Sequence, residues 1–290
     1  MPDPNPSTHR YHAEAGAING SLVLPFEQPI EPQAHAKVPE KGGYLSQHSD
    51  SFRVEGIVSY GAAHTQVSGH QEQKKDRGFK TLATAVVEDL NVLNVVTADR
   101  VVAQVSTEHP LNGFVPKVSF LGTQFVNLRI AGCPVKVDFD WDILSDQPDG
   151  RSLYTRHPGF MTRVASQLGL IRERENLHED IVARYGRGET AKDFRESAAG
   201  ESTEFSLVKK VEGCFPDWCF GHVIDIPNFG RVYLAVVRIT HSDPKGGTDI
   251  YKQTLINLTM IEIKMGCIAT GQMNIANGVT NGNTTPPGGG

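Results

Sequence analysis

The chain contains two stretches in which the same local patterns follow one another in the same order, at residues 100–133 and 231–267. Each begins with an apolar run rich in Val and Ala and passes through a loop that contains Pro and Gly. Each then returns as a second apolar run that ends in Gly-Cys, at Cys133 or Cys267. Runs of β-branched residues bounded by Gly and Pro are typical of β-strands. Because short loops join antiparallel neighbours, the doubled pattern predicts two related antiparallel β units.

Much of the remaining chain also has the periodicity of strands. Residues 52–70 alternate about a glycine-centred bend, and residues 81–107 hold three runs rich in Val and Leu. A helix over Thr81–Leu93 fits the leucine spacing and competes with strands there, whereas the β-branched residues beyond it favour strands. We expect the runs around Val95–Val105 and Val232–Ile239 to form the core.

One segment between the two blocks has helical periodicity instead. Pro158 opens a run in which Phe160, Val164 and Leu168 recur every four residues, and a second apolar face follows over residues 177–185. Such spacing is typical of helices that bury one face. We expect these helices to cover the β body, as a connector over a sheet edge or as a lid.

The predicted fold class is therefore mainly β: an antiparallel sandwich or a barrel-like body, built from two related β units with an α-helical insertion. The N-terminal segment and the C-terminal end are rich in Pro, Gly and polar residues and offer little apolar surface to offset the entropy of ordering. The expected boundaries are an extended N-terminal arm over 1–50, a first β unit over 51–150, the helical insertion over 151–204, a second β unit over 205–278 and a flexible Gly/Pro tail over 279–290.

Composition excludes some classes of function. The 28 Lys and Arg against 33 Asp and Glu give a net charge of −5, which argues against a nucleic-acid partner, since nucleic-acid binders carry a basic excess. No run approaches the ~18 apolar residues of a membrane span. No signal peptide is visible, so a cytoplasmic location is the default expectation and an extracellular one stays open.

The four cysteines are too few for a disulfide framework, and we expect reduced, mostly buried thiols. Cys214, Cys219 and His222 form the densest cluster of metal-ligand residue types, because thiolates and imidazole suit zinc. A disulfide between Cys214 and Cys219 is an alternative, and a simple turn anchored by the neighbouring aromatic residues is the favoured interpretation.

Three carboxylates follow one another at alternate positions, at Asp138, Asp140 and Asp142. On one strand these residues would share a face, and carboxylate oxygens suit Ca²⁺. The segment lacks the glycine and the closing Glu of the twelve-residue calcium loop. A solvated strand edge is therefore the favoured interpretation, with a cation site as the alternative.

Common catalytic motifs are missing from the sequence: there is no nucleophile elbow, no phosphate-binding glycine loop and no His-Glu-x-x-His pair. A catalytic thiol at Cys133 or Cys267 would need a histidine such as His109 or His241, but recurrence at equivalent places favours structural roles. For a pocket between the β body and the helices, the candidate ligand-binding residues are His222, Asp225, His241 and Asp243.

Three segments of the C-terminal third, at residues 205–213, 221–235 and 258–267, resemble a group of uncharacterised bacterial proteins rich in β structure. The resemblance implies a β-rich fold and a bacterial origin. It carries over no catalytic residues, because no activity is established for the group.

The sequence favours a non-enzymatic structural or interaction protein that self-assembles through its N-terminal arm or its sheet edges, since an extended arm can add a strand to a neighbouring sheet. An enzyme or small-ligand-binding protein is the first alternative. A metal-binding module that uses zinc or calcium is the second. We expect no cofactor for the favoured function.

Overall fold

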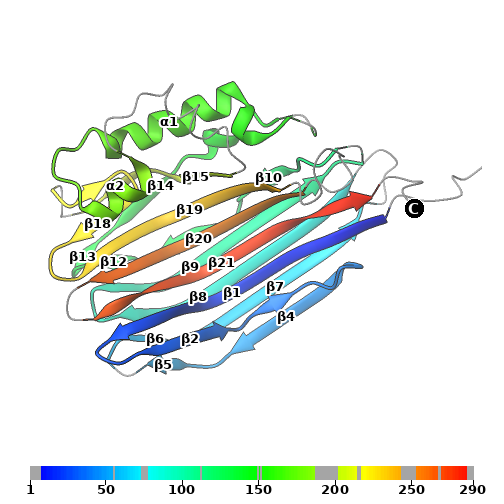
Figure 1. The fold of residues 1–290 in the computed structure, drawn as a ribbon. Helices are drawn as coiled ribbons and strands as arrows, with labels where there is room; N and C mark the ends of the chain where they lie inside the picture. Colours follow the sequence, from blue (N-terminus) through cyan, green and yellow to red (C-terminus); the bar gives the residue numbers. More distant parts are fainter. Residues whose placement is uncertain are drawn as a thin grey trace, which may run out of the picture.

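The computed structural model describes most of the chain. The described residues are 8–54, 56–72, 78–111, 113–148, 150, 152–186, 202–213, 217–242, 253–266 and 269–285. Two large antiparallel sheets lie face to face, and two helices lie along one side of the pair (Figure 1). The expected fold class is confirmed, in the form of a sandwich. No described helix is long and apolar enough to cross a membrane.

Sheet A is nine-stranded and contains both ends of the described chain. Its order is β17-β18-β19-β20-β21-β1-β2, with β15 paired to β19 and β3 paired to β1. The strands are β1 (Thr8–Leu24), β2 (Gln28–Gln33), β3 (Ala36–Lys37), β15 (Ser202–Ser206), β17 (Cys219–Phe220), β18 (Val223–Ile226), β19 (Gly230–Ser242), β20 (Gln253–Gly266) and β21 (Thr270–Thr285).

Sheet B is ten-stranded, with the order β13-β12-β9-β8-β6-β5; β10 and β11 also pair with β9, and β7 joins β4 to β8. The strands are β4 (Gly43–Ser49), β5 (Phe52–Val54), β6 (Val58–Tyr60), β7 (Ala62–Gln71), β8 (Phe79–Val92), β9 (Val96–His109), β10 (Lys117–Ser119), β11 (Gln124–Val126), β12 (Arg129–Ile130) and β13 (Cys133–Pro134). A separate two-stranded ribbon pairs β14 (Lys136–Phe139) with β16 (Val208–Glu212).

Most of the described residues of the predicted N-terminal arm and C-terminal tail lie instead in strands, and β1 and β21 are adjacent inner strands of sheet A. β1 pairs with β21 from Thr8↔Thr285 to Leu24↔Thr270. Both strands are rich in Ala, Gly, Asn and Thr, so their sequences lack the dense apolar runs that predict a strand. They are buried because the two sheets approach closely: a Cβ built on Gly278 would lie 3.0 Å from Val105.

The helices of the insertion form where the sequence predicts them. α1 (Pro158–Arg172) begins at Pro158, and the His157 side chain caps it by accepting a hydrogen bond from the Phe160 backbone N–H at 3.3 Å. α2 (Glu179–Tyr185) follows. Two short 3₁₀ helices, η1 (Trp141–Leu144) and η2 (Tyr154–Arg156), precede them. The apolar face of α1 is buried together with Arg172, and Thr162, Ser166 and Leu170 lie on the side of the helix that faces solvent.

The two similar sequence blocks occupy different sheets. In the first, β9 pairs with three short strands, β10, β11 and β12. In the second, β19 pairs with one 14-residue strand, β20. Both blocks form antiparallel pairs, but the structure does not support an internal repeat beyond that shared pairing.

A line of interrupted pairs crosses sheet A at Ala235 of β19 and Ala276 of β21, with no change of register on either side. Ala235 of β19 and Ala276 of β21 have φ values of 48° and 49°, a conformation uncommon for Ala. The pairing of β19 with β20 passes from Leu234↔Ile261 to Val236↔Thr259 across this line. Regular alternation would place residues five positions apart on opposite faces. Tyr233 and Arg238 nevertheless lie on the same face of sheet A, because Arg184 contacts both the Tyr233 ring and Glu262, and Glu262 accepts a hydrogen bond from Arg238.

Candidate functional site

The residues predicted to line a ligand pocket do not converge. The His222 carbonyl oxygen accepts a hydrogen bond from Leu234 of β19 at 3.0 Å. His241 lies seven positions further along β19, roughly 23 Å away at ~3.3 Å per residue. Asp225 is half-buried on β18, and Asp243 lies outside the described residues.

His222 is a buried partner of α2. Its Nε2 lies 2.9 Å from the Tyr185 hydroxyl oxygen. Burial, and secondarily the positive charge of Arg184, lowers the pKa of His222 to about 3. The ring is therefore neutral at physiological pH and links β17 and β18 to the helical insertion.

The cysteine predictions are partly overturned. Cys133 is disulfide-bonded, so the expectation of four reduced thiols is wrong and this sulfur is not a free nucleophile. Cys219 carries a free thiol, so the alternative Cys214–Cys219 disulfide is also wrong. Burial raises the pKa of Cys219 to about 11, which disfavours the thiolate that a zinc site needs. Cys214 and Cys267 lie outside the described residues.

The three aspartates predicted for one strand face belong to different elements. Asp138 is on β14 and lies 3.5 Å from Lys136. Asp140 follows the strand and caps η1, where its carboxylate accepts a hydrogen bond from the Asp142 N–H at 3.2 Å. Within the described ranges, no group of three or more His, Cys, Asp or Glu side chains is arranged to hold a metal ion.

A buried polar network crosses from sheet B to sheet A, and we call His9, His109, His241, Thr254 and Asn281 the histidine network. His109 Nδ1 lies 3.0 Å from Asn281 Oδ1, and Asn281 Nδ2 donates to the Thr254 carbonyl at 2.5 Å. The His9 and His109 rings lie 4.9 Å apart. These contacts tie β1, β9, β20 and β21 together at one end of the sandwich.

His241 completes the network from β19. Its Nε2 accepts a hydrogen bond from the Tyr154 backbone N–H at 3.2 Å, so the proton is on Nδ1, which donates to Thr254 Oγ1 at 2.8 Å. Burial is the main cause that lowers the pKa of His241 and of His109 to about 4. Both rings are neutral at physiological pH, and their buried position suits a structural role better than acid–base catalysis.

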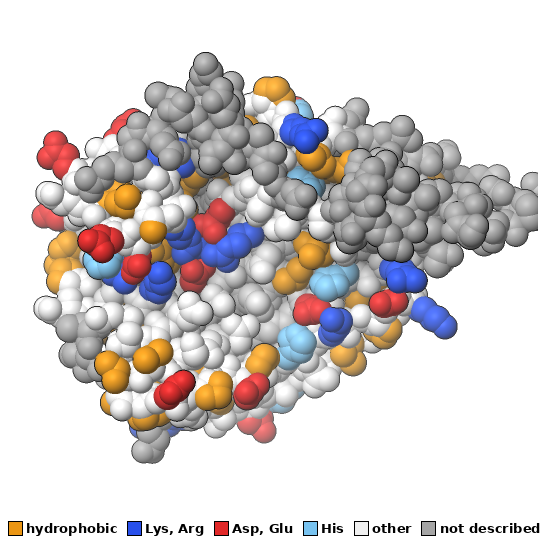
Figure 2. Space-filling view, viewed as in Figure 1, with side chains coloured by type: hydrophobic (Ala, Val, Ile, Leu, Met, Phe, Trp, Pro, Cys, Tyr) orange, Lys and Arg blue, Asp and Glu red, His pale blue; other side chains and the backbone are white. Residues whose placement is uncertain are grey.

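Four charged side chains form a closed ring between α2 and sheet A, and we call Arg184, Glu204, Arg238 and Glu262 the ion-pair ring. Arg184 donates to Glu204 at 2.6 Å and to both Glu262 oxygens at 2.7 and 3.0 Å. Arg238 donates to Glu204 at 2.6 Å and to Glu262 at 2.7 Å. Figure 2 shows charged side chains gathered beneath the helices on this face.

The ion-pair ring is saturated by its own members. Burial opposes ionisation of Glu262, but hydrogen bonds and charge from Arg184 and Arg238 lower the pKa of its carboxyl overall. The Arg184 guanidinium also lies 4.1 Å from the centre of the Tyr233 ring. Each carboxylate is matched by two guanidinium groups, so the ring suits fastening of α2 rather than capture of a ligand. Its four members come from four different elements, α2, β15, β19 and β20, and no local sequence pattern could have identified it.

The strand β4 has an open edge, which is the side of Gly43–Ser49 turned away from β7. On its other side β4 pairs with β7 in continuous register, from Gly43↔Gly69 to Ser49↔Ala63. Five of its seven residues are exposed, and Tyr44 has 62% of its surface exposed. The strand contains no charged residue and no proline. This edge falls within the segment over 1–50 that the sequence predicted to be an extended arm.

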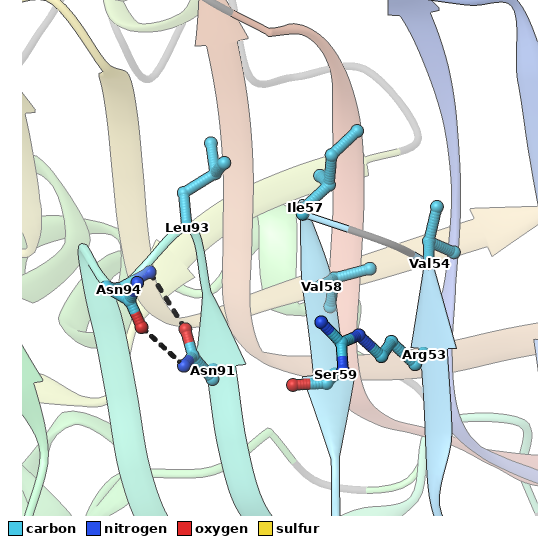
Figure 3. Close-up of a pocket in the computed structure, with 9 residues that line it drawn as sticks. Arg53, Val54, Ile57, Val58, Ser59, Asn91, Leu93 and Asn94 are labelled. Atoms are coloured by element: carbon cyan, nitrogen blue, oxygen red, sulfur yellow. Dashed lines mark hydrogen bonds between the residues drawn. The ribbon is translucent and has the colours of Figure 1, made fainter.

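A small polar pocket of about 260 Å³ lies beyond β4, where β5, β6 and the β8–β9 turn meet (Figure 3). Arg53, Ser59 and Asn91 are neighbours across these three strands. The Asn91 and Asn94 side chains bond each other at 2.7 Å, so much of the polar lining is already paired. The pocket offers one guanidinium on an exposed surface.

The fold and the open edge together define an antiparallel β-sandwich protein with an unprotected edge strand. The chain belongs to the family described as a domain of unknown function (DUF8256), whose model matches residues 9–240. Neither the curated proteins nor the solved structures gave a match.

Proposed function

We propose that this protein is a non-enzymatic interaction protein that associates with itself through the open edge of β4. The observation that carries the proposal is a seven-residue strand, without charge or proline, that is paired on one side only within the part of the chain that the structure describes. Such an edge presents a row of backbone N–H and C=O groups that a second strand can pair with. The preference for a non-enzymatic function is supported by the saturated or buried state of the polar clusters described above.

The other long edge on the same side of the sandwich differs from β4. β2, the last strand of sheet A, contains Pro29, Glu31 and Pro32 within six residues. Proline and charge are the usual devices that prevent edge-to-edge association. Their absence from β4 supports a role for β4 in pairing.

A two-fold axis through Ser46 would place β4 antiparallel to β4 of a second copy. In this register Tyr44 of one copy faces His48 of the other, and both lie on the outer face of sheet B with His64, whose Nδ1 is 3.1 Å from that of His48. Such an isologous interface closes on itself as a dimer. Exposed Tyr supplies the aromatic contact that is enriched at interfaces.

We further propose that the protein works in an oxidising compartment, in place of the default cytoplasmic expectation. The disulfide at Cys133 supports this proposal, because disulfides persist mainly outside the cytosol. Mass spectrometry of alkylated protein isolated from the native host tests it; full alkylation of all four cysteines would contradict an oxidising location.

The test of self-association uses Ser46→Lys, which places two like charges at the proposed axis. Size-exclusion chromatography with light scattering should give twice the mass of one chain for the wild type and a single chain for Ser46→Lys. Ser46→Thr, which keeps strand propensity without charge, should stay dimeric, and so should Gln28→Lys on β2. Association through the open edge of β4 would be ruled out if the wild-type protein stays monomeric after its concentration is raised 100-fold. It would also be ruled out if Ser46→Lys still forms a dimer.

A further inference from the structure

We propose that the groove between β11 and β14 binds an extended peptide that adds a strand between them and carries a basic residue at one end. The groove has a volume of about 640 Å³. It is separate from the open edge of β4, because β11 and β14 lie beyond β9, on the opposite side of sheet B.

The groove exists because two neighbouring chain segments separate. They start as an antiparallel pair, with Arg129↔Pro134 and a hydrogen bond from the Val135 N–H to the Leu128 carbonyl at 2.8 Å. Beyond Val135 the pairing between them stops. β14 leaves to pair with β16, while β11 remains paired with β9. Each strand is therefore paired on one side only among the described residues, with the groove between them.

Val137 points backbone groups into this gap. The N–H groups of alternate residues in a strand face the same edge, so the Val137 N–H faces the same side as that of Val135, toward β11. The neighbouring residues Lys136 and Asp138 face β16, opposite Glu212 and Lys210. A ligand that satisfies Val137 must offer alternating donors and acceptors at strand spacing, which is what an extended peptide provides.

The lining of the groove favours apolar side chains at alternate positions of the peptide. Leu128, Val135 and Val137 contribute aliphatic surface. The rings of Phe125 and Phe139 stack across the groove with centroids 6.0 Å apart. The surrounding rim is polar, as in typical peptide and small-molecule sites.

Charge at one end of the groove specifies the basic residue. Trp141 is 46% exposed and lies 5.2 Å from the Phe139 ring. Asp140 and Asp142 flank it, and within the described residues neither forms an ion pair. Lys136 is already matched by Asp138 and Glu212, at 3.5 and 3.9 Å. A Lys or Arg of the peptide would therefore meet two carboxylates and an indole face, an arrangement that attracts cations.

The probe is a phage-displayed library of linear heptapeptides, selected on the wild-type protein and counter-selected on Val137→Pro. Proline removes the N–H that faces the groove and leaves the pairing with β16 intact. We expect the enriched peptides to alternate apolar residues and to carry a terminal Lys or Arg. Failure to enrich any sequence, or enrichment of proline-rich sequences, would overturn strand addition.

The selected peptide is then synthesised with and without N-methyl groups at alternate residues, a change that removes ladder donors while it keeps the side chains. Binding is followed by Trp141 fluorescence in a Trp218→Phe background, since the chain has two Trp residues. Two N-methylated forms are made, one methylated at the odd-numbered residues of the peptide and the other at the even-numbered residues. We expect one of these two forms to bind at least tenfold more weakly than the unmodified peptide. The double variant Asp140→Asn with Asp142→Asn should also bind the unmodified peptide at least tenfold more weakly. Val137→Ile should bind as the wild type does. Equal affinity for both N-methylated forms would overturn the proposal.

Discussion

The two long sides of the sandwich are protected in opposite ways. One side carries α1 and α2, and the other ends in the strands β2, β4 and β5 (Figure 1). On the helical side, Gln167 of α1 exchanges hydrogen bonds with Ser206 of β15 at 2.7 and 2.8 Å, and the ion-pair ring fastens α2. On the other side, β4 keeps one edge unpaired. The helical side is therefore covered by side-chain contacts from the helices, while among the described residues β4 has a strand partner on one side only.

The largest expected effect comes from breaking the ion-pair ring. Arg184→Met leaves Glu204 and Glu262 each without one of their two guanidinium partners, at sites where their side chains are 22% and 16% exposed. Arg238 alone then faces both carboxylates, so one largely buried negative charge is left uncompensated. We expect a loss of about 3–5 kcal/mol in the free energy of unfolding, because such a charge is costly. Urea denaturation followed by circular dichroism measures this loss.

The matched control for the ion-pair ring is Arg100→Met. Arg100 pairs with Glu88 at 3.0 Å, but its side chain is 50% exposed. Exposed pairs contribute about 0–1 kcal/mol, so the control should unfold nearly as the wild type does. Equal losses in the two variants would show that the ion-pair ring does not secure the helical side.

The next effect is the dependence of stability on pH. The pKa values of His109 and His241 are about 4 in the folded protein and ~6.5 in the unfolded chain. Protons therefore bind the unfolded state first as the pH falls below 6.5, so stability is complete above that value and decreases toward pH 4. Each histidine should remove about 1.4 kcal/mol per pH unit in this window.

His241→Gln tests the contribution of one member of the histidine network. The difference in unfolding free energy between pH 7 and pH 5 should be about 2 kcal/mol smaller in this variant than in the wild type. A wild-type protein with no loss of stability between pH 7 and pH 5 would contradict the buried, neutral state of these rings.

The smallest effect sharpens the contrast between the two neighbouring strand edges. Replacement of Pro29, Glu31 and Pro32 by Thr would remove the devices that protect β2. We expect this triple variant to self-associate more strongly than the wild type does, with an association constant at least tenfold higher, which corresponds to about 1.4 kcal/mol. Analytical ultracentrifugation measures the two constants. The same triple variant combined with Ser46→Lys should associate through β2 alone. No change in either background would show that these residues do not protect the edge.

The strands that the sequence predicts well are those whose own residues supply the apolar surface. β8, β9, β19 and β20 are dense in Val, Ile and Leu, and most of the apolar residues of the predicted core, around Val95–Val105 and Val232–Ile239, are buried. β1 and β21 escape prediction because Ala13, Ala15 and Ala17 become buried only through close approach of the second sheet. Their small side chains carry little periodic signal of their own.

The candidate sites divide in the same manner. That residues 43–49 carry no charge and no proline could have been predicted to matter from the sequence, although the open edge of that strand could not. The ion-pair ring and the groove beside β14 could not, because each depends on segments that are distant in the sequence. Arg184 and Glu262 are separated by 78 positions, and β14 pairs with a strand that follows both helices.

The sequence by itself determines the β-rich class, the position of the helical insertion and the start of α1 at Pro158, because these depend on local periodicity and on the fixed φ of proline. Only the tertiary structure decides that β1 and β21 are adjacent inner strands, that four histidines are buried with lowered pKa values, and that β4 is paired on one side only among the described residues. These features depend on which surfaces meet, and the free energy of burial belongs to the contact between segments rather than to either segment alone.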